Sequence, residues 1–381
     1  MNTINNLLHI LGNTIQKKEI EYKKDLNIEE LYDLATKQGV WHIIFETLKK
    51  QYDVSKYEMK FLTVISKNIT SNEFVYKTVQ RLEENGIECC YLKGIAVARF
   101  YPNSECRVSG DTDILIDPEK QGKAIEILKS MDYYVEEEKE NHHHIQASHK
   151  MTKLLEVHNM LYSKPTRDII FKGHCGYDEE YMEIESSVGK IKTLGINDGL
   201  LYLTVHFIKH FLNSNVNLRQ MVDLLLYMRH YNDQIRWEEY NKLMQELKYH
   251  KLIDTIKAVG NIYFGMDFET VVTDVDDFLK DFEEERPSVY NYYCSAKTDM
   301  NKIEYAKYME NHGEQGRVLK RIFPEREVMK RIGYDNIDSF MGLMMAYLKR
   351  VFWLMMRSLK KKEEGEENRE KKELLKKLGM L

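Results

Sequence analysis

The chain has 381 residues, enough for two or three domains with a sizeable buried core. Lys and Arg number 56 against 61 Asp and Glu, and this net charge of −5 argues against bulk electrostatic binding of nucleic acid. Hydrophobic residues make up 43% and charged residues 31%, which excludes a disordered chain and indicates a globular protein. Only 5 Pro and 19 Gly interrupt the chain, so the sequence predicts a mostly helical protein.

The cysteines and the apolar segments bear on the cellular compartment. Five cysteines without a CxxC pair argue against a disulfide framework and a zinc knuckle. The N-terminus lacks the basic start and apolar centre of a signal peptide, and no segment reaches the ~18 apolar residues of a membrane span. We therefore expect a cytoplasmic protein without a transmembrane segment.

Residues 1–84 predict an N-terminal helical region, because their apolar side chains recur at helical spacing. The pattern changes in residues 85–195, where short apolar runs predict strands. These strands are expected at Ile87–Leu92, Asp111–Asp117, Tyr133–Glu136, His143–Ser148 and Leu154–His158, with helices after Gly94 and Pro118. The order strand, helix, strand, helix, three strands predicts a small mixed sheet.

Helical spacing returns in residues 196–358, which predict a C-terminal helical domain, and residues 359–381 form a charged tail. The fold class is therefore α+β, a small mixed β-sheet core flanked by N-terminal and C-terminal helical regions. An apolar surface at residues 341–356 suits the core of the helical domain better than a membrane surface.

Three carboxylates stand out in the predicted sheet. Strand alternation places Asp111 and Asp113 on one face, where two carboxylates repel each other unless a cation lies between them. Glu156, on a later strand, can supply a third carboxylate, and His158 shares its face. Carboxylates, waters and phosphate oxygens are the ligands of Mg²⁺, and Mn²⁺ is an alternative. The pattern favours a site with one metal and a base, or with two metals.

The segment before this strand suits a polyphosphate. Lys93-Gly94, between a strand and a helix, can present backbone N–H groups and a helix N-terminus. Lys93 and Arg107 can add charge-assisted contacts, and Ser109-Gly110 forms the turn that leads into Asp111.

Together these motifs resemble the nucleotidyltransferase superfamily with the polymerase-β-like fold. The resemblance lies in Leu92-Lys93-Gly94, in Arg107-Val108-Ser109-Gly110-Asp111-Thr112-Asp113 and in Glu156-Val157-His158. It is strongest to a branch of bacterial nucleotidyltransferases and extends over about residues 85–355, with only the central motifs specific. The superfamily usually has Gly-Ser where this chain has Lys93-Gly94; either Lys93 replaces the serine contact or the turn is structural only.

The resemblance implies transfer of a nucleoside monophosphate from an NTP, such as ATP, to an acceptor hydroxyl. Asp111, Asp113 and Glu156 would be the catalytic and metal-binding residues. Five further residues would bind the nucleotide: Lys93, Gly94, Arg107, Ser109 and Gly110. A small molecule, such as an aminoglycoside-like sugar, or a protein side chain is the expected acceptor, with RNA the least favoured.

Two other functions stay open. A catalytically silent module could keep the fold to bind a nucleotide or a partner, which the missing Gly-Ser favours and the three carboxylates oppose. A phosphohydrolase would need a metal at His206, His210 and Asp223. We expect a polar cluster there instead, in which Asp223 accepts a hydrogen bond from Arg219 or a histidine.

Overall fold

The computed structural model describes residues 3–136, 144–162, 180–212 and 216–283, together with 374, 377 and 378. Residues 1–208 and 216–283 form one compact unit, which contains the sheet and the helices packed on it. The predictions for the apolar surface at 341–356, and for nearly all of the charged tail, lie outside the described residues. Among the described helices, none combines the length and apolar character needed to cross a bilayer.

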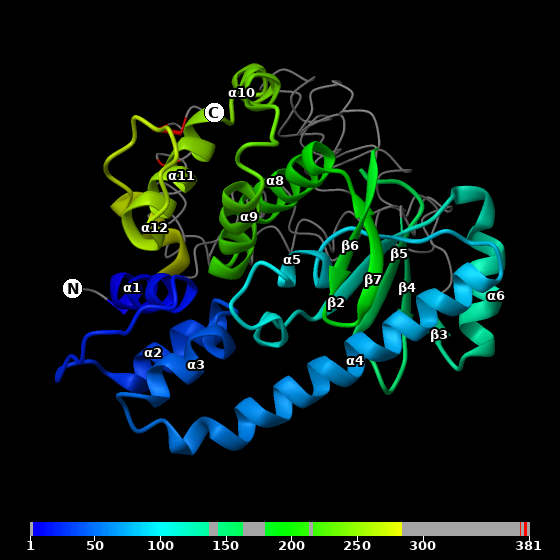
Figure 1. Cartoon of the computed structure of the whole chain (residues 1–381), viewed down its shortest axis with the longest axis horizontal. Helices are drawn as coiled ribbons and strands as arrows, with labels where there is room; N and C mark the ends of the chain where they lie inside the picture. Colours follow the sequence, from blue (N-terminus) through cyan, green and yellow to red (C-terminus); the bar gives the residue numbers. More distant parts are fainter. Residues whose placement is uncertain are drawn as a thin grey trace, which may run out of the picture. The chain divides into compact units, whose positions relative to one another are not determined.

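A single mixed sheet lies at the centre of this unit (Figure 1). Within the described residues it has seven strands in the order β3-β4-β5-β2-β1-β7-β6. Two neighbouring pairs, β2 with β5 and β1 with β7, are parallel, and the other pairs are antiparallel. The strands are β1 Cys90–Tyr91, β2 Asp111–Leu115, β3 Tyr134–Val135, β4 His144–Ser148, β5 Leu154–His158, β6 Tyr181–Ser186 and β7 Gly189–Leu194. The predicted α+β class with a mixed sheet is confirmed.

The strand prediction was incomplete, because it lacked the hairpin of β6 and β7. Charged side chains such as Glu183 and Lys190 alternate there with Ile184 and Ile191, and only one face is buried. A hairpin with one exposed face has few consecutive apolar residues, so it is easily overlooked in a sequence. The first predicted strand is also shorter than expected, since β1 has two residues.

Alternation along the strands separates a core face from a site face. On the core face, Ile114, Leu155 and Val157 pack against α4 (Glu58–Glu84) and α6 (Gln121–Ser130), and Figure 1 shows both helices beside the sheet. On the site face, Leu92 and Leu115 pack with Tyr202 of α8 (Ile196–Leu212). The side chains of Asp111 and Asp113 belong to the site face, because they alternate with Thr112 and Ile114.

A helix that precedes the strands in the sequence packs on a helix that follows them. The first helix, α1 (Thr3–Ile15), contacts α11 (His250–Phe264) so closely that a Cβ on Gly12 would lie 1.9 Å from the carbonyl oxygen of Tyr263. Glycine is therefore required at residue 12. The other α-helices in the described part of the chain are α2 Ile28–Lys37, α3 Trp41–Lys49, α5 Ile95–Ala98, α9 Leu218–His230, α10 Trp237–Glu246 and α12 Asp276–Glu283.

Candidate functional site

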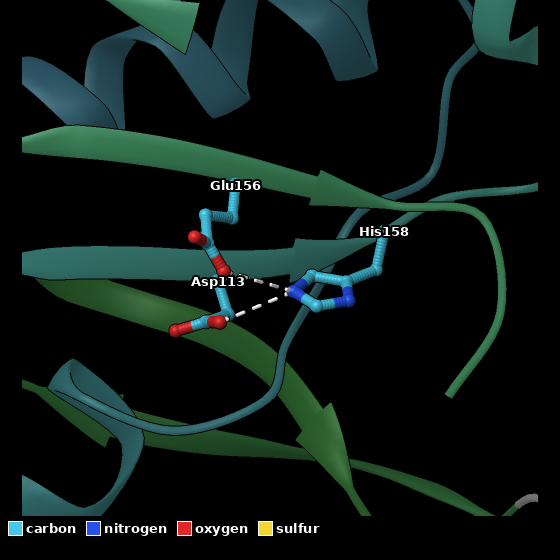
Figure 2. Close-up of side chains that lie close together, drawn as sticks. All are labelled: Asp113, Glu156 and His158. Atoms are coloured by element: carbon cyan, nitrogen blue, oxygen red, sulfur yellow. Dashed lines mark hydrogen bonds and ion pairs between the residues drawn. The ribbon is translucent and has the colours of Figure 1, made fainter. Parts of the chain in front are cut away.

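The register of two parallel strands brings together residues that are 43 positions apart in sequence. Asp113 of β2 pairs with Glu156 of β5, and Leu115 pairs with His158. Both Glu156 and His158 therefore lie on the site face beside Asp113, and Figure 2 shows the three side chains converging. One ligand atom from each lies within 4.8 Å of the others. Among the described residues, this is the group with the spacing of a metal site.

The imidazole of His158 links the two carboxylates of this group. Its Nε2 lies 3.1 Å from Oδ1 of Asp113 and 3.7 Å from Oε2 of Glu156 (Figure 2). Burial lowers the pKa of His158, but the hydrogen bond with Asp113 and the nearby carboxylate of Glu156 raise it, and the pKa ends above its usual value. Gln146 of β4 also donates to Oε1 of Glu156, at 3.2 Å. Histidine and glutamine thus hold Glu156 in one orientation.

Lys93 lies between the two aspartates of β2. Its Nζ is 3.2 Å from Oδ2 of Asp111 and 3.2 Å from Oδ2 of Asp113. Burial lowers the pKa of Lys93, whereas Asp113 and Asp111 raise it, and the net pKa is above its usual value. The repulsion between the two carboxylates is therefore offset by an ammonium group of the chain itself. Asp111 joins the site through Lys93, and it is not part of the Asp113–Glu156–His158 group.

The turn at Lys93-Gly94 depends on the glycine. Gly94 has φ 67° and ψ −107°, a conformation that residues with a Cβ rarely adopt. The helix that follows, α5, has only four residues. Its dipole is correspondingly small, and the expected contribution of a helix N-terminus to anion binding is weak.

Arg107 is buried in an ion pair with Asp223 of α9. Its Nε lies 3.1 Å from Oδ1 of Asp223, and its Nη2 donates to Oδ2. The hydroxyl of Tyr101 donates to the same Oδ1 at 2.7 Å. Asp223 is an acceptor, as the sequence predicted, but its donors are Arg107 and Tyr101 rather than Arg219 or a histidine. Asp223, His206 and His210 do not form a group with metal-site spacing among the described residues, as a phosphohydrolase would need.

A pocket lies between this ion pair and the Lys93-Gly94 turn. Its lining is mostly polar and includes three basic side chains; the residues are Lys93, Gly94, Arg107, Asp111, Leu203, His206, Arg219, Gln220 and Asp223. Arg219 donates from Nη1 to the carbonyl oxygen of Val108, and His206 Nε2 lies 3.2 Å from Nε2 of Gln220.

The predicted Ser109-Gly110 turn borders the site without lining this pocket. Ser109 Oγ donates to the backbone oxygen of Asp111 at 2.9 Å and accepts from Nζ of Lys153, also at 2.9 Å. Here the serine shapes the turn before β2.

Lys153 is the residue of this region that the sequence did not single out. It precedes β5, and its Nζ contacts two neutral oxygens, Oγ of Ser109 and, at 3.4 Å, Oδ1 of Asn68. Among the described residues no carboxylate pairs with it. Burial, together with the nearby charge of Arg107, lowers the pKa of Lys153 to about 7. A lysine before a strand is a common pattern, so no sequence signal distinguishes this one.

Comparison with known proteins yields one family match. A family model described as uncharacterised nucleotidyltransferase matches residues 24–265. The match begins at residue 24, and therefore includes N-terminal helices that the sequence motifs did not mark as diagnostic. No curated protein matches the sequence.

Two solved structures show limited similarity. One is the antibiotic-resistance factor ANT(2'')-Ia, 10% identical, with 49% of this chain and 92% of that chain covered and a TM-score of 0.33. The other is an antigenic nucleotidyltransferase-like protein from Paracoccidioides brasiliensis, 15% identical, with 51% and 91% covered and a TM-score of 0.31. Both TM-scores lie below 0.5, so the family assignment rests on the sequence match.

Proposed function

The chain belongs to the family of uncharacterised nucleotidyltransferases, and on this premise we propose that it transfers a nucleoside monophosphate from an NTP to a hydroxyl of a small molecule or a protein. The observation that carries the proposal is the pairing of Asp113 with Glu156 across two parallel strands, next to Asp111. Three carboxylates gather on one sheet face, where Lys93 and His158 offset part of their repulsion and a divalent cation could take the place of Lys93.

The donor set fits a divalent cation. Asp113 and Glu156 offer carboxylate oxygens within 4.8 Å of each other, and Asp111 adds another at the same sheet face. Oxygen ligands favour Mg²⁺, and the neighbouring imidazole of His158 makes Mn²⁺ an alternative. When bound, such an ion would neutralise charge on the triphosphate and polarise the phosphorus under attack.

The proton transfer and the phosphate contacts would fall to side chains of the protein. The acceptor hydroxyl would form a bond to the α-phosphorus while the bond to the β-phosphate oxygen breaks, so that pyrophosphate leaves. Glu156 would take the proton of the acceptor hydroxyl or bind a second ion, with His158 and Gln146 fixing its orientation. Lys93, which already lies beside two carboxylates, would move toward a phosphate oxygen when a divalent ion takes its place.

The test is turnover by the full-length chain. We would incubate it with each of the four radiolabelled NTPs, Mg²⁺ or Mn²⁺, and a cell extract, and measure label transfer and pyrophosphate release. Transfer that is abolished by EDTA and restored by excess Mg²⁺ is the expected result. Metal-dependent NTP binding without any transfer or pyrophosphate release would instead identify a silent nucleotide-binding module. Transfer that persists in EDTA would contradict the metal assignment.

The proposed location is the cytoplasm, and nucleic acid is the least favoured acceptor because the net charge is −5. The buried thiols of Cys89, Cys90 and Cys106 are compatible with a reducing compartment.

A further inference from the structure

The pocket beside Asp111 contains buried N–H donors that have no acceptor in the described part of the protein. Arg107 is 5% exposed, and although Asp223 binds its Nε and Nη2, its Nη1 has no hydrogen-bond partner. This Nη1 faces the turn, since a Cβ built on Gly94 would lie 3.9 Å from it. The Nε of Arg219, in the lining of the same pocket, is also buried without a partner. Buried donors of this kind are normally satisfied, so these two N–H groups are available to an acceptor that enters the pocket.

The charges of the surrounding groups specify an anion. Arg107, Arg219 and Lys93 face two carboxylates, Asp111 and Asp223, in the pocket lining. Outside the lining, Lys153 adds an ammonium group that no described carboxylate pairs with. Burial is the main cause that lowers the pKa of both Arg219 and Lys153, and the nearby charge of Arg107 lowers both further. Guanidinium groups bind phosphate oxygens through parallel N–H donors.

We propose that Arg107 and Arg219 form the subsite for the terminal phosphates of the nucleotide, which leave as pyrophosphate. This inference rests on the proposed function and adds Arg219, a residue of α9, to the nucleotide site. Asp113 and Glu156 do not line the pocket, whereas Asp111 and Lys93 do. If the α-phosphorus lies beside Asp113 and Glu156, the pocket receives the part of the triphosphate that points away from the reacting atom.

Tyr101 and Asp223 have a positioning role in this arrangement. Asp223 accepts from Nε and Nη2 of Arg107, and Tyr101 in turn donates to Asp223. The carbonyl oxygen of Val108 accepts from Nη1 of Arg219. Both guanidinium groups are thereby fixed before a ligand binds, which lowers the entropy cost of binding.

Calorimetry with inorganic tripolyphosphate, in EDTA and without nucleotide, tests the subsite. We expect the full-length wild type to bind it, Arg219→Gln to bind at least about 10-fold more weakly and Arg219→Lys to fall between them. Arg229→Gln, an exposed residue on the same helix, is the matched control and should bind as the wild type does. Circular dichroism would verify folding, and Arg219→Lys provides the test if Arg219→Gln does not fold.

A nucleotide series locates the effect within the triphosphate. The affinity lost in Arg219→Gln should be largest for the NTP, smaller for the NDP and absent for the NMP. Equal binding of tripolyphosphate by wild type and Arg219→Gln, no binding by the wild type, or equal losses across the series would each overturn the subsite. An active transferase whose KM for NTP is unchanged in Arg219→Gln would refute the subsite alone. Loss of tripolyphosphate binding in a chain without transfer activity would refute only the proposed function.

Discussion

The acidic and basic sides of the site are built in different ways. The acidic side consists of Asp111, Asp113 and Glu156, whose positions follow from strand alternation and from the register of β2 with β5. The basic side joins Arg107 to Asp223, which are 116 positions apart, through a contact between a loop and a helix. Periodicity therefore predicts the first side, whereas the second depends on how α9 packs. The predictions below test this contrast, from the largest expected effect to the smallest.

Asp113→Asn should lower nucleotide transfer by about 10³- to 10⁴-fold, because the carboxylate proposed as the central metal ligand loses its charge. Asp113 is also buried between Lys93 and His158, so the substitution should lower the free energy of unfolding by about 3 kcal/mol. Steady-state kinetics and urea unfolding would measure the two effects. Asp132→Asn, at an exposed position with φ 61°, is the matched control. Near-normal transfer by Asp113→Asn would refute the active-site assignment.

Asp223→Ala should lower the free energy of unfolding by about 3 to 4 kcal/mol, because Arg107 would remain charged and buried without its carboxylate. Urea unfolding monitored by circular dichroism would measure the change. Asp233→Ala, an exposed aspartate just beyond the same helix, should leave stability nearly unchanged.

The double variant Arg107→Met/Asp223→Leu should recover part of the stability lost by Asp223→Ala, since no unpaired charge stays buried. If the double variant were no more stable than Asp223→Ala, the cost would lie in packing rather than in the unpaired arginine.

Lys153→Met should raise the free energy of unfolding at pH 6 by about 2 kcal/mol, because it removes a buried ammonium without an acidic partner. The pKa of Lys153 is about 7 in the folded chain and near its usual value of about 10.4 when unfolded. The unfolded state therefore binds more protons between these values, and the penalty from Lys153 fades as the pH rises.

The gain from Lys153→Met should accordingly shrink between pH 7 and pH 10. Thermal unfolding at several pH values would measure it, with the exposed Lys150→Met as the control. A gain that did not depend on pH would show that the methionine acts through packing and not through charge.

Tyr101→Phe should lower the free energy of unfolding by about 1.5 kcal/mol, since the buried carboxylate of Asp223 loses a 2.7 Å hydrogen bond. Tyr231→Phe is a suitable control, because this tyrosine is also buried and its hydroxyl makes no hydrogen bond with the described residues. Equal stability of the two variants would remove Tyr101 from the set of residues that hold Arg107.

Much of the sheet could be predicted from sequence, because its elements carry local signals. Leu154–His158 was located correctly, since apolar residues alternate there with a carboxylate and an imidazole. The hairpin of β6 and β7 was missed because one of its faces is exposed and charged. The N-terminal helices were recognised as helices, yet the contact of Gly12 with Tyr263 joins segments about 250 residues apart and has no local signature.

The sequence by itself determined the mixed α+β class, the shared face of Asp111 and Asp113, and the resemblance that led to a nucleotidyltransferase. These follow from period-two alternation and from motifs of a few residues, which need no knowledge of the rest of the chain. Only the tertiary structure decided which side chains pair with the charged residues of the site. It placed Lys93 between the aspartates, joined His158 to Asp113 and Glu156, and gave Asp223 to Arg107 and Tyr101. The physical reason is that burying a charge makes a partner necessary without specifying which residue it will be; that choice depends on which side chains packing brings within hydrogen-bonding distance.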